Sequence, residues 1–369
     1  MTNREKFLSV LHSKSNAQMP IVHFGFWDET VAKWENEGFI QNVSQASRND
    51  YWKIIATKLG FDFGYAECFS AETELKPFFD ERIIKEFPDG SQHVFSREGV
   101  IVLKKPGVVS ILTEIDHTLT DRASWEKEYL PRLQFTEDRY DFSKLQDYAQ
   151  GGDPIALSGG SLYGIIRNWF GVIGLSYIAV DDEELYDEVI QTVADLAFNM
   201  VKLGLEKSSQ MGVKFDYINF WEDICFKTGP LINPKVFAEK IGPHYKRITD
   251  IGKQYGIEIF SVDCDGMIDH LLPTWLNNGV NTMFPIEVGT WNASIKPWRD
   301  LYGTGVLGVG GMDKRVFAYD KKAIDTEIER LKPLIALGGF LPCPDHRIAP
   351  DAKWDLVRYY CDRMCREFK

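Results

Sequence analysis

The chain has 369 residues, of which 44% are hydrophobic and 13% aromatic, so it can bury a large core. Its formal net charge of −12 argues against nucleic acid and anionic membrane surfaces as partners over most of the surface. No stretch approaches the ~20 apolar residues of a membrane span. The six cysteines are scattered without a CxxC pair, which predicts reduced thiols in a cytoplasmic protein.

The first part of the chain alternates helices with strands. "TNREKFLSVLHSK" (2–14) predicts a helix capped by Thr2 or Asn3, and it does not resemble a signal peptide. A buried strand is expected at 19–27, and a helix closed by Gly38 at 28–38. A further helix (48–60) and strand (61–69) follow. This part therefore supplies about two strand–helix units.

Residues 83–107 follow a different pattern. They alternate strongly between apolar and polar residues around an Asp89-Gly90 turn, which is typical of an antiparallel hairpin or meander. We interpret about 70–150 as an insertion or side layer of a single domain that covers 1–369. The insertion ends in the helical and irregular stretch "DRASWEKEYLPRLQF".

A regular alternation of strands and helices begins after residue 150. Six strands, each followed by a helix, are expected at 154–159, 215–223, 257–262, 281–288, 305–314 and 339–346. With the two earlier units they make eight, which predicts a (β/α)8 TIM barrel with an N-terminal helical segment. No dinucleotide-binding glycine motif follows the first strand.

Ionisable residues follow the carboxyl ends of these predicted strands. The mouth of a barrel is where such ends converge and where active sites are found. The acids and imidazole expected to carry the chemistry are Glu222, Asp263, Asp265 and His346. Those expected to contact substrate are Trp27, Tyr65, Tyr163, Arg167 and Glu287.

Structural roles are open for several of these residues. Glu222 could cap a helix or pair with Lys227, and Glu287 could pair with a lysine or with Arg315. One of Asp263 and Asp265 could cap the helix expected to begin at Met267, because aspartate favours that position.

At the end of the last strand, Asp345 and His346 could likewise have a structural role, as a pair in which one side chain orients the other for packing. Cys264 lies between the two aspartates and is expected to face the core on the opposite side of the strand.

The stretch "DCDG" (263–266) places two carboxylates close together, and their repulsion must be offset. One solution is a divalent cation held by Glu222, Asp265 and His346, for which mixed oxygen and nitrogen ligands favour zinc. The other is a cationic substrate, or a carboxyl group whose pKa is raised so that it acts as a general acid.

Several motifs together resemble the uroporphyrinogen decarboxylase superfamily over most of 1–369. They are "FGFWDETVAKWENEG", "WEDICFKTGPLINPKVF", "DCDGMIDHLLPTWLNNGVN", "FPIEVG", "GGMDKRVFA" and "GGFLPCPDHRIAPD". The resemblance implies a (β/α)8 barrel with its site at the C-terminal mouth, and dimers are common among such proteins. The superfamily contains decarboxylases and corrinoid-linked methyltransferases.

The region after the first strand favours the methyltransferase branch. Decarboxylases of tetrapyrroles carry an arginine-rich "RQAGRY" stretch there, whereas this chain has "FGFWDETVAKW", with no arginine and two acids. An acidic entrance suits a substrate with eight carboxylates poorly. Decarboxylation of a tetrapyrrole or a related acid stays the alternative, and a sugar- or ligand-binding barrel is the non-enzymatic one.

The thiol-activating members of the methyltransferase branch bind zinc through a His-x-Cys pair and a later Cys. Here Asp263 and Asp265 occupy the first two positions and His346 lies near the third. Such oxygen-rich ligands suit an oxygen substrate. The resemblance therefore implies an O-demethylase component, which passes the methyl group of a methoxylated small molecule to a separate corrinoid protein.

In that interpretation the aromatic residues Trp27, Tyr65, Tyr163 and Trp169 form a wall for the substrate's ring. Arg167 would hold a carboxylate of the substrate.

Overall fold

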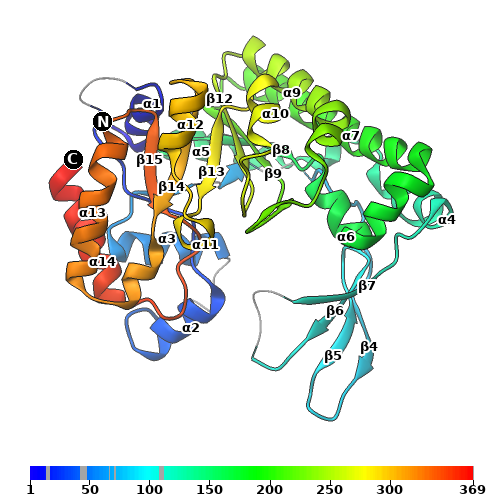
Figure 1. The fold of residues 1–369 in the computed structure, drawn as a ribbon, viewed down its shortest axis with the longest axis horizontal. Helices are drawn as coiled ribbons and strands as arrows, with labels where there is room; N and C mark the ends of the chain where they lie inside the picture. Colours follow the sequence, from blue (N-terminus) through cyan, green and yellow to red (C-terminus); the bar gives the residue numbers. More distant parts are fainter. Residues whose placement is uncertain (14–16, 42–47, 66, 70–71, 108–111, 369) are drawn as a thin grey trace.

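The computed structural model describes residues 1–13, 17–41, 48–65, 67–69, 72–107 and 112–368. Its centre is a parallel sheet with the strand order β15-β14-β13-β12-β9-β8-β3 (Figure 1). These strands are β3 (Cys68–Phe69), β8 (Ala156–Gly160), β9 (Tyr217–Trp221), β12 (Ile259–Asp263), β13 (Thr282–Ile286), β14 (Leu307–Met312) and β15 (Phe340–Pro344). Apart from the inserted segments, neighbours in the sheet are neighbours along the chain, as in a barrel of βα units.

Two further short strands, β1 (Val22–His23) and β2 (Phe63–Gly64), form a separate parallel pair between the two ends of this sheet. Strand β2 precedes β3 in the same passage of chain. On its other side β1 lies against β15. Ile348 donates its N–H to Gly25 O at 3.0 Å, and Trp27 donates to Ile348 O at 3.2 Å. The (β/α)8 fold predicted from the sequence is confirmed, although the first strand is shorter than the 19–27 expected.

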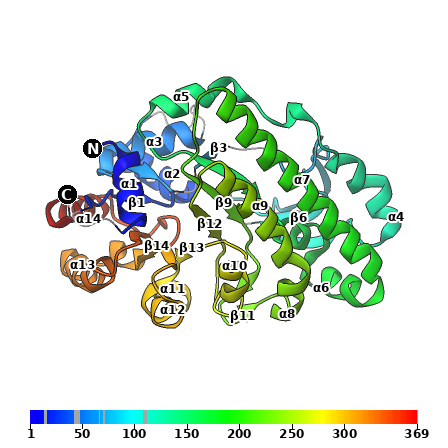
Figure 2. The same ribbon diagram turned by 90° about the horizontal axis from the view of Figure 1, so that it is seen from above.

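Helices surround the strands (Figure 2). They are α2 (Asp28–Asn36), α3 (Arg48–Leu59), α6 (Gly164–Asp181), α7 (Glu183–Gln210), α9 (Gly242–Gln254), α10 (Leu272–Asn277), α12 (Ile295–Tyr302), α13 (Lys321–Ile335) and α14 (Trp354–Phe368), with the short α8 (Pro234–Val236) and α11 (Val288–Trp291). Within the described ranges, none of the helices combines the length and the apolar character needed to cross a bilayer.

Helix α1 (Asn3–Leu11) packs its buried Phe7, Val10 and Leu11 against the residues that fill the barrel interior. Thr2 caps it, accepting a hydrogen bond from the N–H of Glu5 at 3.2 Å, and the Glu5 carboxylate accepts one from the N–H of Thr2 at 2.8 Å. The fully buried Phe7 packs on Phe63 and Tyr217, with ring centroids 6.2 and 5.2 Å away. The expected N-terminal helix thus begins as predicted, while Lys14, at its expected end, lies outside the described residues.

Strand alternation decides which side chains reach the barrel interior. Along β12, Ile259 packs among the interior residues, whereas Phe260 and Val262 pack into the outer core. Ser261 and Asp263 follow Ile259 at intervals of two and share its side of the strand. Cys264 packs into the outer core, as predicted.

The predicted meander is an antiparallel sheet of four strands, which projects from the barrel in Figure 1. Its strands are β4 (Arg82–Glu86), β5 (Gln92–Phe95), β6 (Val100–Lys104) and β7 (Thr113–His117). The turns of α4 (Arg122–Ser124) and α5 (Leu145–Gln150) lie between this sheet and β8, and a small hairpin of β10 (Cys225–Phe226) and β11 (Gly229–Pro230) follows β9. The expected inserted meander is confirmed; residues 70–71 and 108–111 of that region lie outside the described residues.

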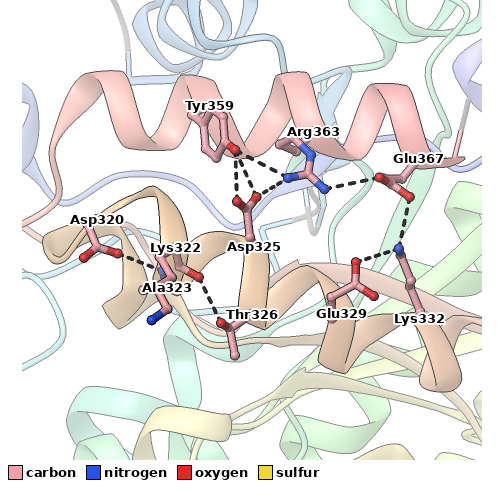
Figure 3. Close-up of polar contacts among 10 residues, drawn as sticks. All are labelled: Asp320, Lys322, Ala323, Asp325, Thr326, Glu329, Lys332, Tyr359, Arg363 and Glu367. Carbon is pink, nitrogen blue, oxygen red and sulfur yellow. Dashed lines mark hydrogen bonds and ion pairs between the residues drawn. The ribbon is translucent and has the colours of Figure 1, made fainter.

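The last two helices are joined by a network of ion pairs (Figure 3). Asp325 on α13 accepts a hydrogen bond from Tyr359 of α14 at 3.0 Å and pairs with Arg363. Arg363 also pairs with Glu367 at 3.2 Å, and Glu367 reaches back to Lys332 at 3.1 Å. Because most of these groups are near the surface, the network orients the two helices more than it stabilises them.

Candidate active site

Carboxyl groups from three successive strand ends gather at the C-terminal mouth of the barrel. Burial raises the pKa of Asp263 well above its usual range, and the charges of Asp265 and Asp223 raise it further. Burial and the charge of Asp265 also raise the pKa values of Asp223 and Glu287. Because these groups act on one another, the mouth favours a protonated carboxyl group at Asp263.

A histidine from the last strand end completes this group. His346 Nε2 lies 3.2 Å from Asp265 Oδ2, so the residues expected to meet across the mouth do so. The His346 ring stacks on Trp27, with ring centroids 5.2 Å apart and planes inclined by 22°, and the Arg347 guanidinium lies 5.1 Å from the centre of the Trp27 ring. Asp265 Oδ1 is buried and has no hydrogen-bond partner among the described residues.

A polar cavity of about 340 Å³ opens beside Asp263. We call it the chamber; it lies between β3, β8, β9 and β12 and is lined by Cys68, Thr73, Glu74, Ser158, Gly160, Ser161, Ile165, Asn219, Trp221 and Asp263. Asn219 is 6% exposed, and its Oδ1 atom has no hydrogen-bond partner in the described part of the chain. A buried acceptor left unpaired in a polar cavity calls for a hydrogen-bond donor, which a bound water or a ligand can supply.

Glu222 requires a correction, because its carboxylate is turned away from the mouth. It accepts hydrogen bonds from the backbone N–H groups of Leu162 at 2.8 Å, Tyr163 at 3.0 Å and Gly164 at 2.6 Å. The hydroxyl groups of Ser161 and Tyr245 also donate to it. Fully buried, it thus caps the start of α6, the helix before its own strand, and we remove it from the site.

Glu287 holds the "DCDG" turn. Its Oε2 accepts the N–H of Gly266 at 2.6 Å, and its Oε1 accepts the hydroxyl of Thr290 at 2.7 Å. Gly266 has φ +87°, and a Cβ atom there would lie 2.6 Å from the carbonyl oxygen of Cys225. Only glycine fits this approach, so Glu287 positions Asp265 through the turn, and its predicted contact with substrate is not supported by its 5% exposure.

Most of the residues predicted to form an aromatic wall lie away from the acidic group. Tyr163 and Trp169 are buried in the core, where the Tyr163 hydroxyl accepts a hydrogen bond from Tyr186 at 3.0 Å. Tyr65 lies inside the barrel, and its hydroxyl is 2.9 Å from Ser261 Oγ. Of the four predicted rings only the half-buried Trp27 borders the acidic group.

Arg167 is engaged within the protein. Its Nη2 donates to the carbonyl oxygen of Asp223 at 2.8 Å and lies 3.3 Å from the Asp223 carboxylate. Asp223 has φ +46°, an uncommon conformation for a residue with a side chain, and Arg167 holds it there. A substrate carboxylate would have to displace this ion pair.

The donor set does not fit the expected zinc ion. Of the three predicted ligands, Asp265 and His346 meet, but the oxygens of Glu222 are occupied by N–H and O–H donors. Among the described residues, no group of three or more His, Cys, Asp or Glu side chains is arranged to hold a metal ion. Structural and catalytic zinc sites need at least three protein ligands.

Sequence reasoning missed most of the chamber. The inward alternation of β9 places Tyr217, Asn219 and Trp221 on one side of the strand, so a polar residue in an apolar strand was the available signal for Asn219. Ser158 on β8 has the same signature. Glu74 comes from the inserted region, and only the folded chain brings it to β9.

Comparison with known proteins adds a likeness of fold. No protein-family model matches the chain, and no curated protein matches it. Among solved structures, a methyltransferase from Methanosarcina mazei is similar over 100% of both chains, with a TM-score of 0.62 and 10% sequence identity. A protein described as a vitamin-B12 independent methionine synthase from Listeria monocytogenes gives a TM-score of 0.44 at 11% identity, covering 96% of this chain and 97% of its own.

At such low identity the Methanosarcina likeness shows a shared fold. The chemistry at the mouth must be argued from the residues of this chain.

Proposed function

We propose that the protein is a methyltransferase that moves the methyl group of a methoxylated small molecule to a corrinoid carried by a separate protein. The observation that carries the proposal is Asp263, a carboxyl group with a raised pKa that faces the chamber. Its fold, shared with a methanogen methyltransferase, is compatible with this role.

Cleavage of a methyl ether needs an acid. The bond between the methyl carbon and the ether oxygen breaks, its electron pair stays on oxygen, and the methyl group passes to the reduced corrinoid, which supplies the attacking electron pair. The oxygen is a poor leaving group unless it takes a proton as the bond breaks. Protonated Asp263 supplies that proton and becomes a carboxylate.

The neighbours of Asp263 fit this cycle. The charge of Asp265 keeps the proton on Asp263 in the resting protein, because two adjacent carboxylates resist ionising together. His346 lies against Asp265 and can return a proton from solvent to the pair. Trp27 stacks on His346 and fixes the orientation of its ring.

The acidic mouth argues against the alternative of tetrapyrrole decarboxylation. A substrate with several carboxylates would approach Asp223, Asp263, Asp265 and Glu287, while Arg167 is already paired with Asp223. No cluster of free arginines opposes this field among the described residues that surround Asp263, and like charges at a binding site disfavour binding.

The direct test is transfer of a methyl group from 2-methoxyphenol to free cob(I)alamin, followed by visible absorbance. Asp263→Asn should slow transfer by about 10²–10⁴-fold, the usual contribution of a general acid. Asp300→Asn, which changes an exposed aspartate on α12, is the matched control and should leave the rate unchanged. Absence of transfer by the unaltered protein from every methoxylated compound tried would contradict the proposal.

A further inference from the structure

The chamber has a distinct hydrogen-bonding character. The polar groups of its lining residues are the hydroxyl groups of Thr73, Ser158 and Ser161, the thiol of Cys68, the amide of Asn219, the indole N–H of Trp221 and the carboxyl groups of Glu74 and Asp263. Among the described residues that line it, none is lysine, arginine or histidine. The chamber therefore offers acceptors and adaptable hydroxyl groups without a fixed positive charge.

Asn219 is the strongest single indication of a ligand. It projects from the middle of β9 into the barrel, and only 6% of the residue's surface is exposed. Its Oδ1 has no hydrogen-bond partner among the described residues. An unpaired buried amide oxygen destabilises the protein, and a bound donor would remove that cost. An N–H or O–H group on the ligand is the partner that this atom requires.

The charged groups near the chamber also favour a ligand group without negative charge. Arg97 and Arg347 act on Glu74 and Asp263 through space, but neither lines the cavity. A carboxylate placed in the chamber would face two carboxyl groups and an amide oxygen, with no cation in contact to offset its desolvation. A hydroxyl or ammonium group would find an acceptor in Asn219 Oδ1 and further acceptors in the hydroxyl groups of Thr73 and Ser158.

We propose that the chamber binds the head group of the substrate, and that this group is a hydrogen-bond donor without negative charge, a hydroxyl or an amine, which Asn219 selects. This inference rests on the proposed methyl transfer only in assuming that the bound molecule is methoxylated. The methoxy oxygen would then lie toward Asp263 and the head group toward Asn219. Trp221, which also lines the chamber, supplies an apolar surface for the body of the molecule.

The test uses four compounds that share one scaffold: 2-methoxyphenol, 2-methoxybenzylamine, 2-methoxybenzoate and methoxybenzene. Their affinities for the full chain are measured by calorimetry, without any corrinoid. The hydroxyl and amine compounds should bind at least about tenfold more tightly than methoxybenzene and 2-methoxybenzoate, the factor expected for one good hydrogen bond. Equal or tighter binding of the benzoate, or no binding of any of the four, would overturn the inference.

Variants of Asn219 separate selectivity from folding. Asn219→Leu keeps the size of the side chain and removes its acceptor, so the advantage of 2-methoxyphenol over methoxybenzene should fall about tenfold. Asn219→Asp should shift the preference toward 2-methoxybenzylamine, and Asn36→Leu, at an exposed position, controls for the substitution. If Asn219→Leu does not fold, Ser158→Ala, at the position on β8 that pairs with Asn219, should reduce the same advantage of 2-methoxyphenol, and an unchanged advantage would count against the inference.

The two proposals fail in different ways. Selective binding without methyl transfer would overturn the proposed function and keep the head-group preference. Methyl transfer with equal rates for the phenol and the benzoate, unaffected by Asn219→Leu, would overturn the head-group preference alone.

Discussion

The substitution Glu222→Gln tests whether Glu222 supports the fold or takes part in the chemistry. Three backbone N–H groups and two hydroxyl groups donate to its buried carboxylate. Alanine would leave three buried N–H groups without an acceptor, which at about 1–3 kcal/mol each would remove about 3–9 kcal/mol. That is comparable with the whole stability of a domain, so glutamine is the informative change.

Glutamine keeps one acceptor oxygen, but it places an amide NH2 group, which is itself a donor, against the N–H and O–H donors that surround this side chain. One or two bonds and their charge assistance are lost, so the free energy of unfolding should fall by about 2–4 kcal/mol. Urea denaturation followed by circular dichroism measures the change, and Glu239→Gln, at an exposed position, should stay within about 0.5 kcal/mol of the unaltered protein. Unchanged stability of Glu222→Gln, together with lost activity, would refute the structural role.

Three further predictions follow from burial and charge. Because the folded protein raises the pKa of Asp263, the unfolded chain loses a proton that the folded protein keeps once pH exceeds the ordinary aspartate value, so stability falls by up to about 1.4 kcal/mol per pH unit. Asp263→Asn should therefore raise the melting temperature at pH 7 and not at pH 4; an equal effect at both would contradict this. Phe7→Ala should lower the free energy of unfolding, measured with denaturant, by about 3–5 kcal/mol, since Phe7 is fully buried among the barrel-interior residues. A decrease below about 1 kcal/mol would argue against this packing of α1 on the barrel. Ser261→Ala should cost about 1–3 kcal/mol by leaving the Tyr65 hydroxyl unpaired, and less when combined with Tyr65→Phe; additive effects would mean that the two groups do not interact.

The architecture could be predicted because its signals are local and repeated. Strand and helix periodicity after residue 150, the capping of α1 and the alternation around Asp89-Gly90 each appear within a short window of sequence. Counting units then favoured a barrel, and the convergence of strand ends placed Asp263, Asp265 and His346 near one another.

The wrong assignments share one physical cause. A sequence shows that Glu222 follows a strand but not that three N–H groups of the preceding strand–helix connection point at it. Tyr163 and Trp169 are likewise buried by packing of α6 against distant segments. Asn219 and Glu74 meet at the chamber only because β9 and the inserted region approach each other in space.

The central claim is that Asp263 protonates the departing oxygen, and the dependence of rate on leaving group tests it most directly. Methyl transfer to cob(I)alamin is measured with 2-methoxyphenol and with a nitro-substituted 2-methoxyphenol, whose departing oxygen needs little protonation. We predict that Asp263→Asn slows methyl transfer about 10²–10⁴-fold with the first compound and far less with the second. An equal loss with both compounds, or no loss with either, would contradict the assignment of Asp263 as the acid.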